Sequence, residues 1–181
     1  MKNSATIRKI TYSAMFLVIA LFLPFLTGQV PQIGSMLLPM HLPVLIAGFI
    51  CGPVWGLAVG MIAPLMRSLI FSMPPILSAA VMTFELGAYG LIAGLMYKAF
   101  NKNTGWVIPD LIVAMLGGRI IWGIASYVVY AVDGGTFTLS AFIAGAFINA
   151  IPGIMLQLVL IPLLVFVFKR AKLMPADSAA V

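Results

Sequence analysis

Six long apolar segments, separated by short breaks rich in proline, glycine and polar residues, fill most of this 181-residue sequence. A helix needs about 20 apolar residues to cross roughly 30 Å of hydrocarbon, and fewer where it lies inside a bundle. Only 8% of the residues are charged, against about 25% in soluble domains, so a water-facing shell cannot be built. The sequence therefore predicts an all-α integral membrane bundle of six transmembrane helices in one domain, residues 1–181. The predicted segments are 10–26, 42–51, 54–71, 76–100, 107–132 and 139–168.

The breaks between these segments differ in kind. Residues 27–41 contain glycine, proline and glutamine and are expected to form a loop, whereas Gly52-Pro53 merely interrupts an apolar run. The last segment is longer than a straight crossing needs, so Pro152 and Pro162 are expected to kink it. The tail, residues 173–181, is expected to be disordered.

The basic residues give an orientation. Eight of the ten Lys and Arg residues fall into three groups, and six crossings place all three groups on the same side of the membrane. By the positive-inside rule that side is cytoplasmic, with both termini there. The pI of about 9.8 then reflects topology and not nucleic-acid binding. The basic start resembles a signal peptide but lacks a cleavage site, so we expect a retained first helix. The three groups are Lys2, Arg8, Lys9; Lys98, Lys102; and Lys169, Arg170, Lys172.

Several polar side chains lie inside the predicted segments. Ionisable groups there cost about 2.5–3.5 kcal/mol on insertion scales, face the bundle interior and mark function. Their depths favour a polar pocket that opens outward; the alternative is a structural Arg–Glu pair without a ligand. Arg67, near a segment end, could instead snorkel to the surface. The candidate substrate-binding residues are Arg67, Glu85, Tyr89, Arg119, Trp122, Asn149, Gln157 and, at an outer helix start, His41.

Small residues recur every four positions at Gly48, Gly52, Gly56 and Gly60, and again at Gly90 and Gly94. This spacing lets helix backbones approach closely in lipid. Two readings stay open: packing inside this bundle, or a sliding surface against a partner membrane subunit.

Motifs for chemistry are missing. The sequence has no G-x-x-x-x-G-K-[ST], no H-E-x-x-H and no G-x-S-x-G, so neither an ATPase nor a hydrolase is expected. The single cysteine, Cys51, excludes an intrachain disulfide and a cysteine metal cluster. We expect no cofactor and no metal. A small channel or facilitator is a rival, but the inner halves of the first, third and fourth segments are nearly all apolar.

Four stretches resemble the substrate-binding S component of energy-coupling factor (ECF) vitamin transporters. They are LPMHLPVLIAGFICGPVWGLAVGMIAPLMRSLIF (38–71), TFELGAYGLIAGL (83–95), LGGRI (116–120) and NAIPGIMLQLVLIPL (149–163). The resemblance implies six helices, a site near the extracellular face, and toppling in the membrane to deliver the substrate. It also implies three partners, namely a transmembrane coupling subunit, EcfT, and two cytoplasmic ATPases, EcfA and EcfA′.

The resemblance implies a docking surface on the first helix, where many members carry A-x-x-x-A. Here Ala14 is followed by Val18, so these two are the expected contacts. Among members, those for pantothenate look most similar, and those for hydroxymethylpyrimidine and pyridoxine are also similar. Two arginines against one glutamate leave the pocket positive, which suits a ligand with one carboxylate, such as pantothenate.

Overall fold

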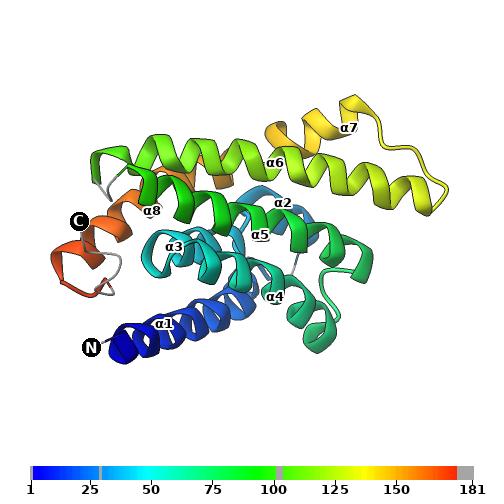
Figure 1. Cartoon of the computed structure of the whole chain (residues 1–181). Helices are drawn as coiled ribbons and strands as arrows, with labels where there is room; N and C mark the ends of the chain where they lie inside the picture. Colours follow the sequence, from blue (N-terminus) through cyan, green and yellow to red (C-terminus); the bar gives the residue numbers. More distant parts are fainter. Residues whose placement is uncertain (1, 29, 101–103, 175–181) are drawn as a thin grey trace.

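A computed structural model describes residues 2–28, 30–100 and 104–174, and within these ranges every regular element is helical. The long helices run roughly side by side, and the start of α1 and the end of α8 lie at the same end of the bundle, near the two termini of the described chain (Figure 1). Six helices are long and apolar enough to cross a membrane, which confirms the predicted fold class. The elements are α1 (Lys2–Phe22), η1 (Leu23–Thr27), α2 (Pro31–Leu37), α3 (His41–Cys51), α4 (Pro53–Phe71), α5 (Ile76–Ala99), η2 (Thr104–Trp106), α6 (Val107–Val132), α7 (Leu139–Ile143), η3 (Ala144–Ile148) and α8 (Ile151–Arg170).

The expected loop at residues 27–41 is partly helical. Pro31 begins α2, where the fixed φ of proline and its missing N–H suit the first turn of a helix. The helix ends at Leu37, and the residue that caps it, Leu38, has a left-handed φ of 51°. Together α2 and α3 form one apolar span, Gln32–Cys51, so this crossing is longer than the predicted ten-residue segment.

The predicted last segment, 139–168, is divided in the structure. α7 and the π-helical turn η3 precede a bend at Asn149 and Ala150, and the membrane-spanning helix α8 begins at Ile151. Pro152 therefore lies in the first turn of α8 and begins a helix, where the sequence led us to expect a kink. Pro162 does lie inside α8. Of the tail expected to be disordered, residues 175–181 lie outside the described residues.

The centre of the bundle is α3. Nearly all of its residues are buried, and it contacts α1, α4, α5 and α8. A helix that is apolar on every side is stable only when other helices surround it. The predicted break at Gly52 separates α3 from α4, and its φ of 99° suits glycine. The chain therefore reverses here at a single residue.

The glycine rows pack inside this bundle. A Cβ on Gly48 would lie 2.5 Å from the carbonyl oxygen of Gly90, and one on Gly56 would lie 2.6 Å from the same atom. A Cβ on Gly94 would lie 2.5 Å from the backbone nitrogen of Pro53. α3, α4 and α5 thus touch backbone to backbone, which favours the internal-packing reading of these glycines.

Gly90→Ala is expected to lower the free energy of unfolding by about 1–3 kcal/mol, because the added methyl would overlap the Gly56 carbonyl group and backbone cannot move aside cheaply. Thermal melting in detergent measures the effect. Gly117→Ala is the matched control: it is also within a helix, but its Cβ would meet only the flexible end of Ile92. Equal melting temperatures for the two variants would contradict this packing.

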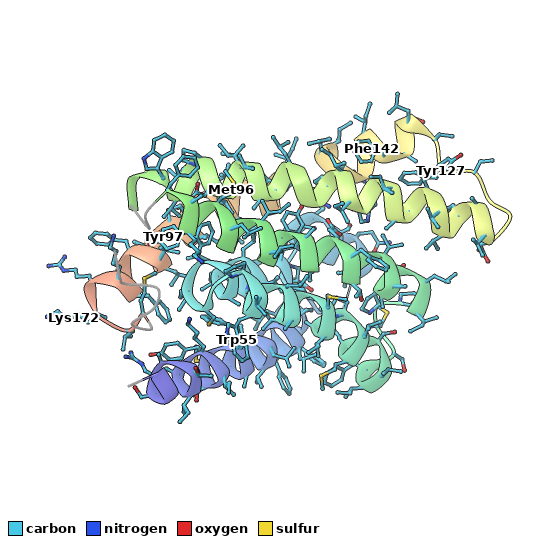
Figure 2. All side chains as sticks on the ribbon, viewed as in Figure 1. Trp55, Met96, Tyr97, Tyr127, Phe142 and Lys172 are labelled. Carbon is cyan, nitrogen blue, oxygen red and sulfur yellow. The ribbon has the colours of Figure 1, made fainter. Side chains whose placement is uncertain are left out.

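Several basic residues lie at the end of the bundle where α1 begins and α8 ends. Lys9 and Lys98 line one cavity there, and Lys169 and Arg170 lie in the last turn of α8. Arg8 on α1 donates a hydrogen bond to the carbonyl oxygen of Leu173, 3.1 Å away, just after α8. Tyr97 and Lys172 lie toward this end, while Tyr127 and Phe142 lie toward the opposite end (Figure 2).

Candidate functional site

A cavity of about 520 Å³ opens near the end of α1, the start of α3 and the α4–α5 turn. It lies between the end of α1, the α2 region, the start of α3, the α4–α5 turn and the middle of α6. Six of the eight candidate residues line it, from five different helices or turns. They are His41, Arg67, Glu85, Arg119, Trp122 and Asn149.

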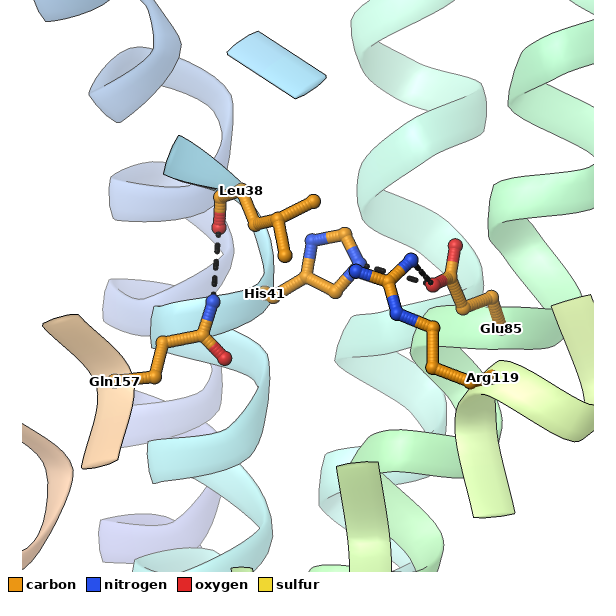
Figure 3. Close-up of polar contacts among 5 residues, drawn as sticks. All are labelled: Leu38, His41, Glu85, Arg119 and Gln157. Atoms are coloured by element: carbon orange, nitrogen blue, oxygen red, sulfur yellow. Dashed lines mark hydrogen bonds and ion pairs between the residues drawn. The ribbon is translucent and has the colours of Figure 1, made fainter. Parts of the chain in front are cut away.

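An ion pair between two helices forms the polar centre of this cavity. Nη1 of Arg119 on α6 donates to Oε1 of Glu85 on α5 over 2.7 Å. Nε2 of His41, at the start of α3, lies 3.3 Å from the same oxygen. Figure 3 shows the three side chains converging from three helices. All three are almost fully buried, so the charge of Glu85 is balanced inside the protein.

Three buried nitrogens at this centre make no hydrogen bond with the described residues: Nη2 of Arg119 and both ring nitrogens of His41. Nη2 is a donor, whereas a neutral imidazole has one donor and one acceptor nitrogen. Buried polar atoms without a partner are rare in native proteins and cost free energy. Both side chains line the cavity. A ligand with an acceptor oxygen would satisfy Nη2 of Arg119.

Arg67 is buried and does not snorkel to the surface. One of its guanidinium nitrogens donates to the carbonyl oxygen of Leu21 at the end of α1. The guanidinium carbon also lies 4.9 Å from the ring centre of Phe25 and 5.4 Å from that of Phe71. It has no carboxylate partner among the described residues. Glu85 pairs with Arg119 and not with Arg67, so the charge of Arg67 remains available at the cavity.

Tyr89 and Gln157 lie behind the cavity lining. The ring of Tyr89 packs edge-on against His41, with 5.1 Å between ring centres, and against Gly118. Nε2 of Gln157 on α8 lies 3.5 Å from the carbonyl oxygen of Leu38, next to the cavity (Figure 3). The structure thus places both residues where they hold the α2–α3 region and His41 in position.

The side of the cavity next to α6 is aromatic. Trp122 stacks on Phe142 of α7, with 6.0 Å between ring centres, and meets Phe137 edge-on at 5.7 Å. A Cβ on Gly145 would lie 2.7 Å from the Trp122 ring, so this π-helical turn comes close because it carries no side chain there. Asn149 follows at the end of the turn and adds an amide to the lining.

Sequence reasoning missed many residues of the lining. The segment from Pro24 to Met40 supplies eight of the twenty lining residues, and the turn Met73–Pro75 supplies another three. The signal was available: a 15-residue connection between two apolar segments is longer than most, and such connections are often functional. The missed lining residues are apolar or carry hydroxyl groups. Because they are uncharged, the pattern of ionisable groups in the sequence does not point to them.

Together these observations define a class of protein: a multi-pass membrane protein with a solute-sized cavity around a buried ion pair, and with no catalytic constellation among its described residues. The family model described as "ECF transporter, substrate-specific component" matches residues 8–165. The chain belongs to this family. No curated protein and no solved structure matches it significantly.

Family membership establishes the role. The protein is the substrate-binding subunit of an ECF transporter and is not an enzyme. It works with the coupling subunit EcfT and with EcfA ATPases, which energise the uptake.

Proposed function

We propose that this subunit captures pantothenate from outside the cell in the cavity between α1, α3, α5 and α6. The observation that carries the proposal is the charge of the lining: Arg67 and Arg119 against a single carboxylate, Glu85. An excess of one positive charge suits a ligand with one carboxylate, which forms charge-assisted hydrogen bonds to guanidinium groups. His41 lines the cavity beside Arg119 and adds a polar ring to the site.

The remaining groups of pantothenate also find partners. It has two hydroxyls and an amide, and the lining offers the amide of Asn149 and the hydroxyls of Thr27, Ser35 and Ser78. Leu38, Met40 and Met82 supply the apolar surface that a small branched substrate needs. The cavity volume of about 520 Å³ lies within the range typical of small-molecule sites.

Hydroxymethylpyrimidine or pyridoxine is the second candidate. The observation that favours it is Trp122, an aromatic side chain in the lining on which a flat ring could stack. Neither molecule carries a carboxylate, so neither would use the second arginine as an anion partner.

The experiment is a binding comparison of the three vitamins by isothermal titration, together with mass spectrometry of any small molecule that co-purifies with the protein. We expect pantothenate to bind most tightly. Tighter binding of pyridoxine or hydroxymethylpyrimidine, or co-purification of either, would replace pantothenate with the second candidate.

We also propose that the end carrying the termini faces the cytoplasm, as the positive-inside rule indicates. The cavity then opens outward. In this orientation α1 presents Ala14 and Val18 on its exposed face, one turn apart, and Val18 is 52% exposed. This small-residue position is where EcfT is proposed to dock.

Ala14→Phe is expected to weaken assembly with EcfT at least tenfold, because the ring would hold the two helices apart. Co-purification of the tagged variant with EcfT and the ATPases measures it, and vitamin binding should stay unchanged. Met15→Phe, on the neighbouring exposed position, is the control. Normal assembly of Ala14→Phe would move the docking site elsewhere.

The subunit alone should not accumulate substrate. Because it contains no nucleotide-binding motif, liposomes that hold only this chain are expected to bind radiolabelled vitamin without concentrating it. Liposomes that also hold EcfT and the ATPases should concentrate it when ATP is inside. Accumulation against a gradient by the chain alone would contradict the dependence on ATPase partners.

A further inference from the structure

A second cavity, of about 270 Å³, lies at the opposite end of the bundle, near the termini. It is enclosed by the ends of α1, α3, α4 and α5, and it shares no residue with the substrate cavity. The proposed binding of the vitamin does not involve this second cavity. Its polar and charged lining residues include Lys9, Lys98, Tyr97 and Trp55.

Two lysines from different helices meet at this cavity. Lys9 comes from α1 and Lys98 from the last turn of α5. No acidic side chain lines the cavity among the described residues. Asp110 interacts electrostatically with Tyr97 but is fully buried and outside the lining. The cavity is therefore a basic one.

Uncapped backbone donors face the same space. α4 begins at Pro53 after Gly52, without a side chain that caps its first turn. The N–H groups of Val54 and Trp55 have no partner inside the helix. These two residues, together with Gly52 and Pro53, line the cavity. A helix of this length directs partial positive charge toward its N-terminus, which favours an anion there.

The hydroxyl of Tyr97 is an independent sign of a missing partner. Tyr97 lines the cavity and is only 2% exposed, and its oxygen makes no hydrogen bond. A buried hydroxyl without a partner is costly, so an acceptor from a ligand would stabilise it. Figure 2 places Tyr97 toward the end that carries the termini.

One rim of the cavity is apolar and faces the lipid. Val54 is 70% exposed and Trp55 is half-buried, in the position where amphipathic rings sit at a membrane interface. Exposed apolar side chains continue along α4 at Met61 and Ile62. A free phosphate would leave this surface uncovered, whereas acyl chains would cover it.

We propose that this cavity binds the phosphate headgroup of an anionic phospholipid, with Lys9, Lys98 and the start of α4 around the phosphate and the acyl chains along α4. Basic pockets between membrane helices on the cytoplasmic side are suited to such headgroups. A lipid held here joins the ends of α1, α4 and α5. The proposal does not depend on which vitamin the other cavity binds.

The test uses the delipidated full chain in detergent, titrated with phosphatidylglycerol and followed by native mass spectrometry. Lys9→Gln/Lys98→Gln is compared with Lys169→Gln/Arg170→Gln, which removes the same charge from the same end of the molecule but outside the cavity. We expect the first variant to bind phosphatidylglycerol roughly 10- to 30-fold more weakly and the second to bind it as wild type does. Phosphatidylcholine with the same chains should bind weakly to all three proteins. Vitamin binding should be unchanged in both variants, which shows that they are folded.

Three results would overturn the proposal. Equal losses in both variants would mean that the lipid senses only the total charge of this end. Displacement of phosphatidylglycerol by equimolar inorganic phosphate would mean that the cavity binds a free anion. The third result is that both variants still bind phosphatidylglycerol, but that adding EcfT displaces the lipid and covers the two lysines. The cavity would then be assigned to an acidic side chain of the partner subunit.

Discussion

Glu85→Gln is expected to lower the free energy of unfolding of the substrate-free protein by about 3–5 kcal/mol, the cost of breaking one side of a buried ion pair. The change keeps the shape of the side chain and removes its charge. Arg119, which now donates to Oε1 of Glu85 over 2.7 Å, would remain buried without a carboxylate partner. Water in the cavity would place the effect toward the lower end of this range.

Affinity for the substrate should fall as well. Glu85 holds one guanidinium nitrogen of Arg119, which leaves Nη2 of the same side chain as the unpartnered donor. Without the carboxylate, this guanidinium loses its fixed orientation and the ligand hydroxyls lose an acceptor. Saturating pantothenate should restore part of the lost melting temperature, because its carboxylate supplies the missing negative charge.

A double-mutant cycle separates the ion pair from other effects of each substitution. Glu85→Gln/Arg119→Gln removes both charges, so its loss of stability should be smaller than the sum of the two single losses. Thermal melting of the four proteins gives the coupling energy. Wild-type melting temperature and affinity in Glu85→Gln would show that Glu85 is neutral and structural.

The sequence predicts the bundle well because its strongest signal is the length of its apolar segments. This length is what a helix needs to cross the hydrocarbon core of a membrane. Six apolar helices and the break at Gly52 follow from composition and from one Gly-Pro pair. The short helices α2 and α7 do not follow, because neither is long enough to show a hydrophobic period. Residues 139–168 read as one segment, since apolar side chains continue through the bend at Asn149.

In the candidate site, too, the sequence reveals some features and not others. A buried charge is visible in a sequence, so Arg67, Glu85 and Arg119 could be found without a structure. The partner of each charge could not, because pairing depends on how helices are rotated and packed. Arg67 therefore bonds the end of α1 and stacks near Phe25, while Arg119 takes the glutamate.

Gln157 illustrates that the depth of a polar residue does not give the direction of its side chain. Its side chain reaches the carbonyl oxygen of Leu38, whose left-handed conformation ends α2 and leads into His41. Depth along a helix is readable from residue spacing, but the direction in which the side chain points is set by tertiary packing. The ligand contact of Gln157 stays a prediction; in the structure its side chain lies beside the carbonyl oxygen of Leu38, behind the cavity lining.

Arg119→Ala is expected to weaken pantothenate binding by about 1.5–3 kcal/mol, or roughly 10- to 150-fold, the range for hydrogen bonds to a charged group. The loss has two sources: the donor Nη2 disappears, and the carboxylate of Glu85 then faces the ligand carboxylate with only His41 beside it. Isothermal titration measures the change, on protein that still purifies as a folded monomer. Arg119→Lys is the control that keeps the charge but loses the planar pair of donors.

A change in the ligand shows which arginine binds its carboxylate. The alcohol analogue of pantothenate, in which CH₂OH replaces the carboxylate, should bind wild type much more weakly than pantothenate does. If Arg119 is the anion partner, Arg119→Ala should nearly abolish this discrimination, and Arg67→Ala should preserve it. Arg67 has no carboxylate partner within the protein, so the reverse result would make Arg67 the anchor and Arg119 the structural partner of Glu85. Because ligand and side chain are varied together, a general loss of folding, which lowers the affinity for both ligands equally, cannot imitate either outcome.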